Sequence, residues 1–253
     1  MTGCPGTAGS LWVVVPALDE ARLIGATLGR LAEQTDLDYT LVVVDNASTD
    51  RTVEVVRTFA ATAPFPVTVV REDERGIGPA VDTGCRYAIA RGARLLARTD
   101  ADCLPERGWV AAVRAAFADG AAMAYGPVIA RRDENGLVGR MAFRMLVGVA
   151  SAAAPLRPAN RTGPGHRAPY RLHAGNNMAI TAELYSAIGG MPRQSQATDR
   201  LLFDRVRRHT AAIKRSRAMV VENSTRRLRA YGVVGTALWY LERGTRGHDE
   251  NPR

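Results

Sequence analysis

Short apolar runs that alternate with helix-type patterns are the feature that most constrains the fold of this chain. Three runs, Leu11–Val15, Leu41–Val44 and Leu95–Ala97, contain no polar residue, and a polar turn follows soon after each of them. Strands that are buried on both faces show such continuous runs, whereas half-buried strands alternate. Segments with apolar residues at helical spacing separate the runs. This order predicts an α/β fold with a mostly parallel central sheet that is flanked by helices.

The remaining periodic segments continue this pattern. We expect further strands at 66–71, 123–129 and 217–222, and a first helix at about 19–33. Asp19 is a candidate N-cap of that helix, and Ser48 or Thr49 of the second, because short side-chain oxygens accept hydrogen bonds from the free N–H groups of a first turn. Further helices are expected at about 79–91, 106–118, 137–153, 181–188, 198–208 and 231–243.

The length and the lack of an internal repeat predict one domain with two halves. A chain of 253 residues can bury one large α/β core. The alternation of strand and helix patterns ends after Ile129. We therefore expect a first half at about 10–129 and a second half at about 130–243. In the second half, residues 155–171 are rich in Pro, Gly and Arg, so we expect a long mobile loop there. Residues 1–9 and 244–253 are expected to be disordered.

Composition narrows the classes of partner and compartment. The net charge is +9 and Lys214 is the single lysine among 34 basic residues, which favours anionic partners. Basic residues do not interleave with aromatic ones, so nucleic-acid binding is not expected. Three cysteines without metal-ligand spacing indicate a reducing compartment. No apolar run approaches the roughly 18 residues of a membrane span. We therefore expect a cytoplasmic protein without a transmembrane segment, either free or attached to the inner face of a membrane.

Two carboxylates, Asp100 and Asp102, follow the run Leu95–Ala97 with one residue between them. Crowded carboxylates repel one another, and a cation must offset that repulsion. A divalent metal suits the position, because Mg²⁺-type ions bind through one or two carboxylates and complete their shell with waters and substrate phosphates. A solvated turn of the Asp-x-Asp type is the alternative interpretation.

Three of the predicted strands end in acidic or turn-forming segments. These are Pro16-Ala-Leu-Asp-Glu20, Asp45-Asn-Ala-Ser-Thr-Asp50 and Thr99-Asp-Ala-Asp102. In a parallel sheet they lie at one edge, where open α/β sheets bind ligands. A glycine-rich segment, 76–84, begins the third helix. The order and spacing of these segments resemble the family-2 glycosyltransferases of the GT-A fold, and the resemblance covers roughly residues 11–240.

The resemblance implies a Rossmann-like GT-A sheet with a smaller acceptor-side region. It also implies an inverting, Mn²⁺- or Mg²⁺-dependent transfer of a sugar from a nucleotide diphosphate sugar, with uridine as the expected base. By resemblance, Asp45 accepts from the base, Asp100 reaches the ribose or donor sugar, and Asp102 holds the metal. The residues implied in donor binding are Pro16, Leu18, Glu20, Asp45, Arg71, Arg75, Gly76, Asp100, Ala101, Asp102, Arg226 and Arg227. Asp82 departs from the family, which usually has asparagine there.

The second half matches the family less completely. Asn176 and Asn177 resemble its acceptor-side segment, and Asp199 stands where the family has its catalytic base. Thr198 replaces the acid that usually precedes this base. The segment Ser224-Thr-Arg-Arg227 resembles one that clamps the donor diphosphate in one branch of the family.

The acceptor is the least constrained partner. An acceptor hydroxyl or amine could belong to a small molecule, a carrier-bound intermediate or a polyprenyl phosphate of a bacterial biosynthetic pathway. Four arginines in the loop favour an anionic acceptor: Arg157, Arg161, Arg167 and Arg171. Two other functions stay open at this stage, a sugar-phosphate nucleotidyltransferase and a non-catalytic nucleotide-sugar-binding homologue. The sequence does not indicate whether the chain is a monomer or an oligomer.

Overall fold

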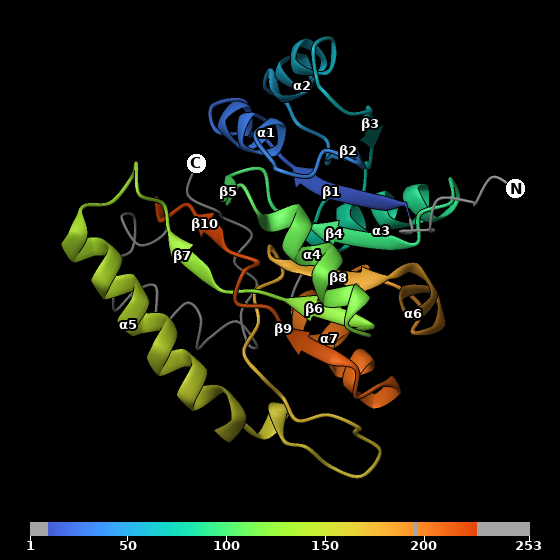
Figure 1. Cartoon of the computed structure of the whole chain (residues 1–253), viewed down its shortest axis with the longest axis vertical. Coiled ribbons are helices and arrows are strands. Elements are labelled where there is room, and N and C mark those ends of the chain that lie inside the picture. The colour runs from blue at the N-terminus through green and yellow to red at the C-terminus, as the bar shows by residue number, and fades with distance from the viewer. Residues whose placement is uncertain (1–9, 195–196, 227–253) are drawn as a thin grey trace, which may run out of the picture.

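A computed structural model describes residues 10–194 and 197–226, and a seven-stranded sheet forms its centre (Figure 1). In chain order the strands are β1 (Leu11–Ala17), β2 (Tyr39–Asp45), β3 (Val67–Arg71), β4 (Leu95–Arg98), β6 (Met123–Tyr125), β8 (Met178–Thr181) and β9 (Ile213–Arg215). In space the order is β3-β2-β1-β4-β8-β6-β9. Strand β8 pairs antiparallel with β4 and β6, and the other described pairs of this sheet are parallel. The expected α/β class with a mostly parallel sheet is confirmed.

Helices cover both faces of the sheet. One face carries α1 (Ile24–Ala32), α2 (Thr52–Ala60) and α4 (Trp109–Ala118), and the other carries α3 (Ile77–Ile89), α6 (Ala182–Ala187) and α7 (Thr198–His209). Successive strand residues point to opposite faces. Accordingly, Val13 packs in the first hydrophobic cluster and Val14 in the second. Both valines are fully buried, which is why the strand sequence is continuously apolar.

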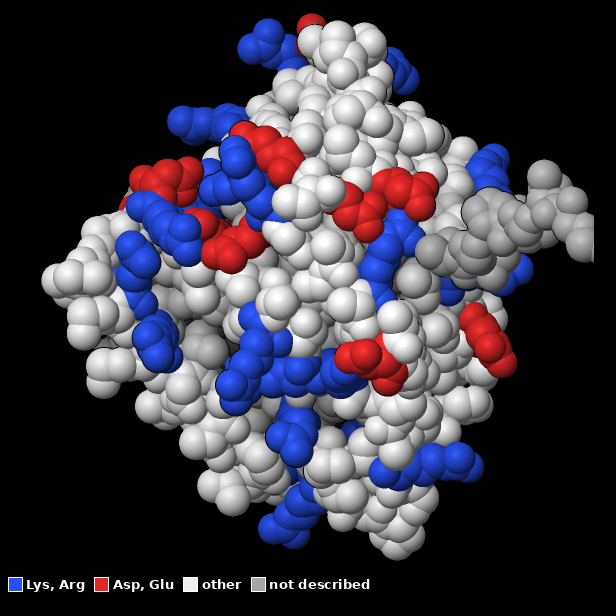
Figure 2. All heavy atoms as spheres, in the orientation of Figure 1, with Lys and Arg blue, Asp and Glu red and all other residues white. Residues whose placement is uncertain are grey.

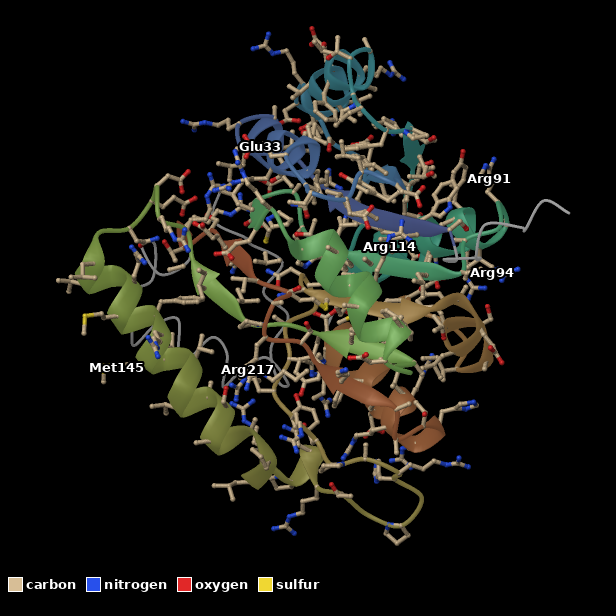
Figure 3. All side chains as sticks on the ribbon, in the orientation of Figure 1. Glu33, Arg91, Arg94, Arg114, Met145 and Arg217 are labelled. Atoms are coloured by element: carbon tan, nitrogen blue, oxygen red, sulfur yellow. The ribbon has the colours of Figure 1, made fainter. Side chains whose placement is uncertain are left out.

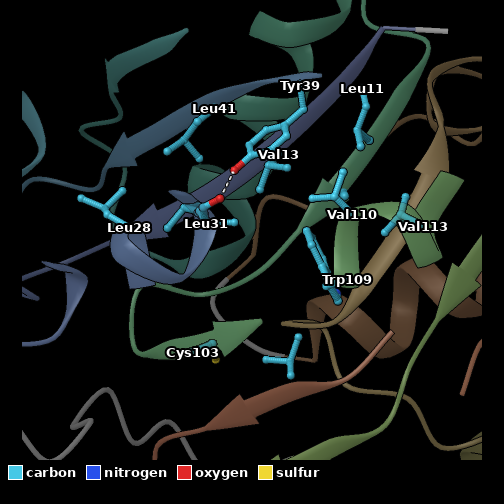
Figure 4. Close-up of a cluster of buried hydrophobic side chains, with 14 of the residues drawn as sticks. Leu11, Val13, Leu28, Leu31, Tyr39, Leu41, Cys103, Trp109, Val110 and Val113 are labelled. Atoms are coloured by element: carbon cyan, nitrogen blue, oxygen red, sulfur yellow. Dashed lines mark hydrogen bonds between the residues drawn. The ribbon is translucent and has the colours of Figure 1, made fainter. Parts of the chain in front are cut away.

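The cluster beneath α1 and α4 shows how helices are fixed to the sheet (Figure 4). Leu28 and Leu31 of α1 and Trp109 of α4 are fully buried there. The Tyr39 hydroxyl donates to the Leu31 carbonyl oxygen at 2.8 Å, so its polar tip is satisfied inside the core. Burial of an aliphatic side chain such as Leu28 or Leu31 stabilises the folded state by about 1.5–3 kcal/mol.

On the other face, α3 approaches the sheet closely at Gly84. A Cβ atom at this position would lie 2.6 Å from Val14 Cγ1 and 2.7 Å from Val44 Cγ2. Any larger side chain would therefore push the helix away from β1 and β2. The glycine-rich sequence thus places the start of α3 against the strand ends that carry the candidate site.

A second, smaller sheet lies beside the central one. Its strands are β5 (Cys103–Pro105), β7 (Val128–Ala130) and β10 (Val221–Asn223), in the order β5-β10-β7. Helix α5 (Leu137–Ala153) follows β7 and runs along the outer edge of the molecule (Figure 1). Two 3₁₀ turns, η1 (Ala154–Leu156) and η2 (Pro158–Asn160), follow α5. The expected mobility of 155–171 stays a prediction.

Several boundaries differ from the sequence-based expectations. The single strand expected at 123–129 is two strands, β6 and β7, in different sheets, separated at Gly126-Pro127. A Cβ atom at Gly126 would lie 1.8 Å from the Met219 carbonyl oxygen, so the chain needs glycine to cross there. The segment expected to lead into the helix at 181–188 forms β8 instead. The expected strand at 217–222 is shorter, at Val221–Asn223, and the helix expected at 231–243 lies outside the described residues.

The expected helix caps were wrong. The N-cap positions of α1 and α2 are Leu23 and Arg51, and neither has a side-chain cap bond. The Asp19 carboxylate instead accepts from the backbone N–H of Thr49, and the Ser48 hydroxyl accepts from the N–H of Asp19. Asp19 and Ser48 thus join the loops that follow β1 and β2. A prediction from local capping patterns does not include such contacts between distant segments.

The expectation that no stretch matches a membrane span was also wrong on length and composition. The 20-residue helical stretch Leu137–Leu156 has a mean hydropathy of 1.4. Arg140 and Arg144 break the apolar run in the sequence, but the other residues outweigh them in the mean.

Candidate functional site

The carboxyl ends of β1, β2 and β4 meet at one edge of the sheet, as expected for parallel neighbours. The loops that follow β1 and β2 hold one another by hydrogen bonds. Besides the bonds of Asp19 described above, the Ala21 N–H donates to the Asp50 carboxylate at 3.0 Å and the Glu20 N–H donates to the Thr52 hydroxyl at 2.8 Å. These ties fix the backbone at Glu20, so its side chain points from a rigid loop.

Asn46 joins the third loop to this edge. Its side-chain oxygen accepts from the Gly76 N–H at 2.7 Å, and its side-chain nitrogen donates to the Glu72 and Glu74 carbonyl oxygens at 3.1 and 2.7 Å. Gly76 has a φ of 137°, a conformation that side chains rarely adopt. The glycine is therefore required where the chain turns from β3 into α3.

Charged side chains of opposite sign alternate across the edge. The Arg226 guanidinium binds both oxygens of the Glu20 carboxylate and lies 3.1 Å from Asp102 Oδ2. On the other side of the Asp-x-Asp turn, the Arg98 guanidinium bonds Asp100 Oδ1 at 3.0 Å and Asp199 Oδ1 at 2.8 Å. Four carboxylates from three regions of the sequence thus converge around two arginines.

The Asp199 carboxylate packs directly against Gly175, where only glycine leaves room for it. A Cβ atom on Gly175 would lie 2.1–2.3 Å from the Asp199 carboxyl atoms. Helix α7 begins at Thr198, which brings Asp199 to the first turn, and Thr198 itself packs toward Gly78 of α3. Thr198 is buried, so a charged acid at this position would have to lose its contact with water.

Burial disfavours the charged forms of two carboxylates at this edge. Burial raises the pKa of Glu20, although the hydrogen bonds from Arg226 oppose the shift. Burial also raises the pKa of Asp100, with the charge of Arg98 opposing and that of Asp102 reinforcing the shift. Positive charge beside the turn favours the ionised forms of these acids, and Arg98 and Arg226 supply such charge.

The carboxylates fit a divalent metal only together with a ligand. Among the described residues, no group of three or more His, Cys, Asp or Glu side chains could hold a metal ion. Asp102 offers hard carboxylate oxygens, and one of them contacts the cationic Arg226. A hard cation with one or two carboxylates takes its other ligands from water and phosphate. The donor set therefore suits a metal carried with a diphosphate, and Arg226 would have to give up its contact with Asp102.

Several predicted donor residues lie at this edge with side chains in different settings. Pro16 is buried within β1, Leu18 is partly exposed just beyond the strand, and the Asp45 carboxylate at the end of β2 accepts from the Ser48 N–H at 3.2 Å. Arg71 is exposed and bonds Asp73, and Arg75 is exposed beside Gly76.

Other predicted residues have their side chains inside the protein. The Ala101 side chain is in the hydrophobic core and its carbonyl oxygen accepts from the Thr27 hydroxyl, so both are engaged within the protein. Asn177 is fully buried, accepts from Trp109 and donates to two carbonyl oxygens, which is a structural role. Asn176 bonds Asn223 and Cys103, and its side-chain oxygen is buried without a partner.

Arg227 lies outside the described residues. Asp82 bonds Tyr185 and Arg86 and lies 3.7 Å from Arg193, which also pairs with Glu72.

Sequence reasoning missed Arg98 and Arg131. Arg98 is the last residue of β4, and the available signal was a charged residue at the end of an apolar run, two positions before Asp100. Arg131 is buried and donates to the Asp102 carbonyl oxygen at 3.2 Å, so it supports the turn from the side of β7.

The sequence of this chain is similar to those of known glycosyltransferases. Residues 12–174 match the family model described as Glycosyl transferase family 2. A PGL/p-HBAD biosynthesis glycosyltransferase of Mycobacterium bovis is 31% identical over 121 residues, which are 47% of this chain and 46% of that protein. An undecaprenyl-phosphate mannosyltransferase of Micrococcus luteus is 34% identical over 89 residues, 35% of this chain and 36% of that protein. The chain thus spans about half the length, or less, of these curated relatives.

Solved structures show the same fold. The mannosyltransferase PcManGT from Pyrobaculum calidifontis, in complex with GDP-Man and Mn²⁺, is similar with a TM-score of 0.66 and 26% identity, over 96% of this chain and 66% of that one. S. aureus TarS 1–349 in complex with UDP-GlcNAc is similar in fold, with a TM-score of 0.61 and 15% identity over 85% of this chain and 58% of that one. The family match covers more than half of the chain and contains the three strand-end segments described above. The chain therefore belongs to glycosyl transferase family 2.

Proposed function

We propose that this chain transfers a sugar from a nucleoside diphosphate sugar to an acceptor hydroxyl or amine, with inversion at the anomeric carbon. The observation that carries the proposal is the convergence of Glu20, Asp102 and Asp199 with two arginines at the carboxyl edge of the sheet. Family membership supports the reaction class. The relatives' names differ in sugar and acceptor, so neither follows from them.

The donor is proposed to bind with its base near Asp45 and its diphosphate near Asp102 and Arg226. A buried carboxylate at the end of β2 suits a neutral N–H of a uracil, although the solved relatives bind GDP-Man in one case and UDP-GlcNAc in the other. Arg226 can exchange its contact with Asp102 for the diphosphate oxygens. A divalent metal held by Asp102 and the diphosphate would supply additional positive charge to offset that of the departing group.

The proposed transfer is a single displacement. Asp199 accepts the proton of the acceptor group while that group attacks the anomeric carbon, and the bond from this carbon to the diphosphate oxygen breaks on the opposite face. Arg98 holds the Asp199 carboxylate in place, and Arg226 offsets the negative charge that develops on the diphosphate. A second displacement would need a nucleophile beside the sugar, and we assign none of the described residues to that role.

The acceptor is proposed to be anionic or carrier-linked. Arg157, Arg161, Arg167 and Arg171 are all exposed, and no acidic residue occurs between Leu156 and Leu172. The Micrococcus relative is named for an undecaprenyl-phosphate acceptor, which is one acceptor of this class. Such an acceptor would meet positive charge on this side of the molecule before it reaches Asp199.

The test is a donor and acceptor panel with purified protein and Mn²⁺. UDP-glucose, UDP-GlcNAc and GDP-mannose are offered with a short polyprenyl phosphate, a free sugar and an aromatic alcohol, and the release of nucleoside diphosphate and the anomeric configuration of the product are measured. Release that depends on Mn²⁺ and an inverted product are expected. Binding without transfer or hydrolysis of any donor would favour the non-catalytic homologue. Release of pyrophosphate from a nucleoside triphosphate and a sugar phosphate would favour the nucleotidyltransferase.

A further inference from the structure

Helix α5 carries a stripe of exposed apolar side chains on the outside of the protein. Among its 17 described residues, none is buried. Leu137, Met141, Met145 and Val149 recur every fourth residue and are exposed by 70, 57, 70 and 67%. Side chains at this spacing form one stripe along a helix. Figure 3 shows Met145 on the outer side of α5, away from the central sheet.

The surroundings of this stripe are positive. Arg140 and Arg144 are exposed on α5, and each precedes a methionine of the stripe by one position, so they lie along one edge of it. From Gly136 to Leu172 the chain has six arginines and no Asp or Glu, and all six arginines are exposed. At the lower left edge of the molecule, where α5 runs, Figure 2 shows uncharged and basic side chains. An apolar stripe with arginines beside it is complementary to an anionic lipid surface.

Both ends of α5 are fixed to the same domain. Before the helix, the Arg131 N–H donates to the Asn223 carbonyl oxygen and the Arg132 N–H to the Glu222 carboxylate. After it, the Arg167 N–H donates to the Arg207 carbonyl oxygen at 2.7 Å. A helix that crossed a bilayer would leave its ends on opposite sides of the membrane, whereas these ends return to one folded body. A position parallel to the surface satisfies both the exposed stripe and the fixed ends.

The amino end of α5 lies next to the candidate site. Thr225 donates to the Glu134 carboxylate and to the Asn135 side chain, and the following residue is Arg226, which contacts Asp102. We infer that α5 is a membrane-docking helix, which lies in the interface of an anionic bilayer with Leu137, Met141, Met145 and Val149 turned into the lipid. The inference does not depend on which sugar is transferred, and vesicle binding tests it without activity.

The first experiment measures sedimentation of the protein with vesicles. Phosphatidylcholine vesicles with and without about 30% phosphatidylglycerol are compared at low and high salt. The wild type is expected to bind the anionic vesicles, more weakly at high salt. Met141→Glu with Met145→Glu is expected to lower the partition coefficient at least about tenfold, because two apolar contacts are lost and two acids enter the stripe.

A matched control adds the same charge elsewhere. Leu37→Glu with Ala61→Glu places two acids at exposed positions of the first half and is expected to leave binding nearly unchanged. Thermal unfolding of both double variants shows that the fold persists. No binding of the wild type, or equal losses in both variants, would overturn the inference. A wild-type dimer that the α5 variant converts to a monomer would assign the stripe to a second copy of the chain instead.

A second experiment separates a helix that lies in the interface from one that crosses it. Met145→Cys in a Cys4→Ser background carries an environment-sensitive fluorophore, since Cys85 and Cys103 are buried. Lipids with quenchers near the glycerol are expected to quench this label more than lipids with quenchers at the acyl-chain ends. The opposite order would place residue 145 near the bilayer centre and contradict a position parallel to the surface.

Discussion

The strand-end site and helix α5 are organised in opposite ways. At the site, buried and half-buried acids and arginines hold one another across up to 206 positions of sequence, as in the Glu20–Arg226 pair. On α5, Leu137, Met141, Met145 and Val149 are exposed, and none of the helix residues is buried. Several contacts thus fix each charged side chain of the site, whereas the apolar stripe of α5 is exposed and can meet a partner.

Asp102→Asn should remove most of the metal-dependent turnover while the fold persists. The change removes one carboxylate from a site that is proposed to stabilise the leaving diphosphate, and about 4 kcal/mol of lost stabilisation corresponds to about 10³-fold in rate. Nucleoside diphosphate release with and without Mn²⁺ measures the effect. Unchanged metal-dependent turnover would exclude Asp102 from the site.

Asp199→Asn should lower the transfer rate about 10²–10⁴-fold and leave donor affinity nearly unchanged, because it removes the proposed general base but keeps the side-chain shape. Single-turnover rates and nucleotide-sugar titration separate the two quantities. A collapse of donor affinity with an unchanged rate for bound substrate would make Asp199 a donor-binding residue instead.

Arg98→Met should lower the free energy of unfolding by about 3 kcal/mol. The guanidinium is buried and pairs with Asp100 and Asp199, so its removal takes a buried cation away from both acids. Urea unfolding measures the loss. Arg193→Met is the matched control: Arg193 pairs with Glu72 and Glu74 but is 39% exposed, so its loss should cost less than about 1 kcal/mol.

Asp204→Asn should cost about 1–2 kcal/mol at neutral pH, and the cost should vanish in acid. Burial raises the pKa of Asp204, but hydrogen bonds from Arg208, Arg207 and His166 bring it down to about 2. In the unfolded chain an aspartate has a pKa near 3.9. The stabilisation is therefore complete above about pH 4 and is lost as the pH falls through about 2. Urea unfolding from pH 7 to 2 measures it, and a pH-independent difference would contradict this origin.

Val149→Ala should change the free energy of unfolding by less than about 0.5 kcal/mol in solution, because this side chain of α5 is 67% exposed. Val13→Ala, which removes the same atoms from a fully buried site in β1, should cost about 2–3 kcal/mol. Equal losses would show that α5 packs against the domain in solution, and the contrast between the two regions would fail.

The sequence was sufficient to predict the long periodic elements and the edge of the sheet that carries the site. Residues 137–153 were expected to be a helix and α5 has these bounds, because its apolar spacing is regular over 17 residues. Strands of three or four residues, such as β5, β8 and β9, have too few positions for a period to be recognised. Contacts between distant charges also leave no local pattern. Arg98 meets Asp199 across 101 positions, and only the fold brings the two together.

The position of β8 between β4 and β6 has a consequence for the nascent chain. Leu95 of β4 pairs with Thr181, so β4 gains its neighbour on that side only after some 80 more residues have been made. Until then a hydrophobic strand edge is open to other chains. Translation that halts before residue 178 would leave a sheet of β1–β4 whose last strand recruits partners by its backbone, so premature fragments of this protein should aggregate and not persist as half-domains.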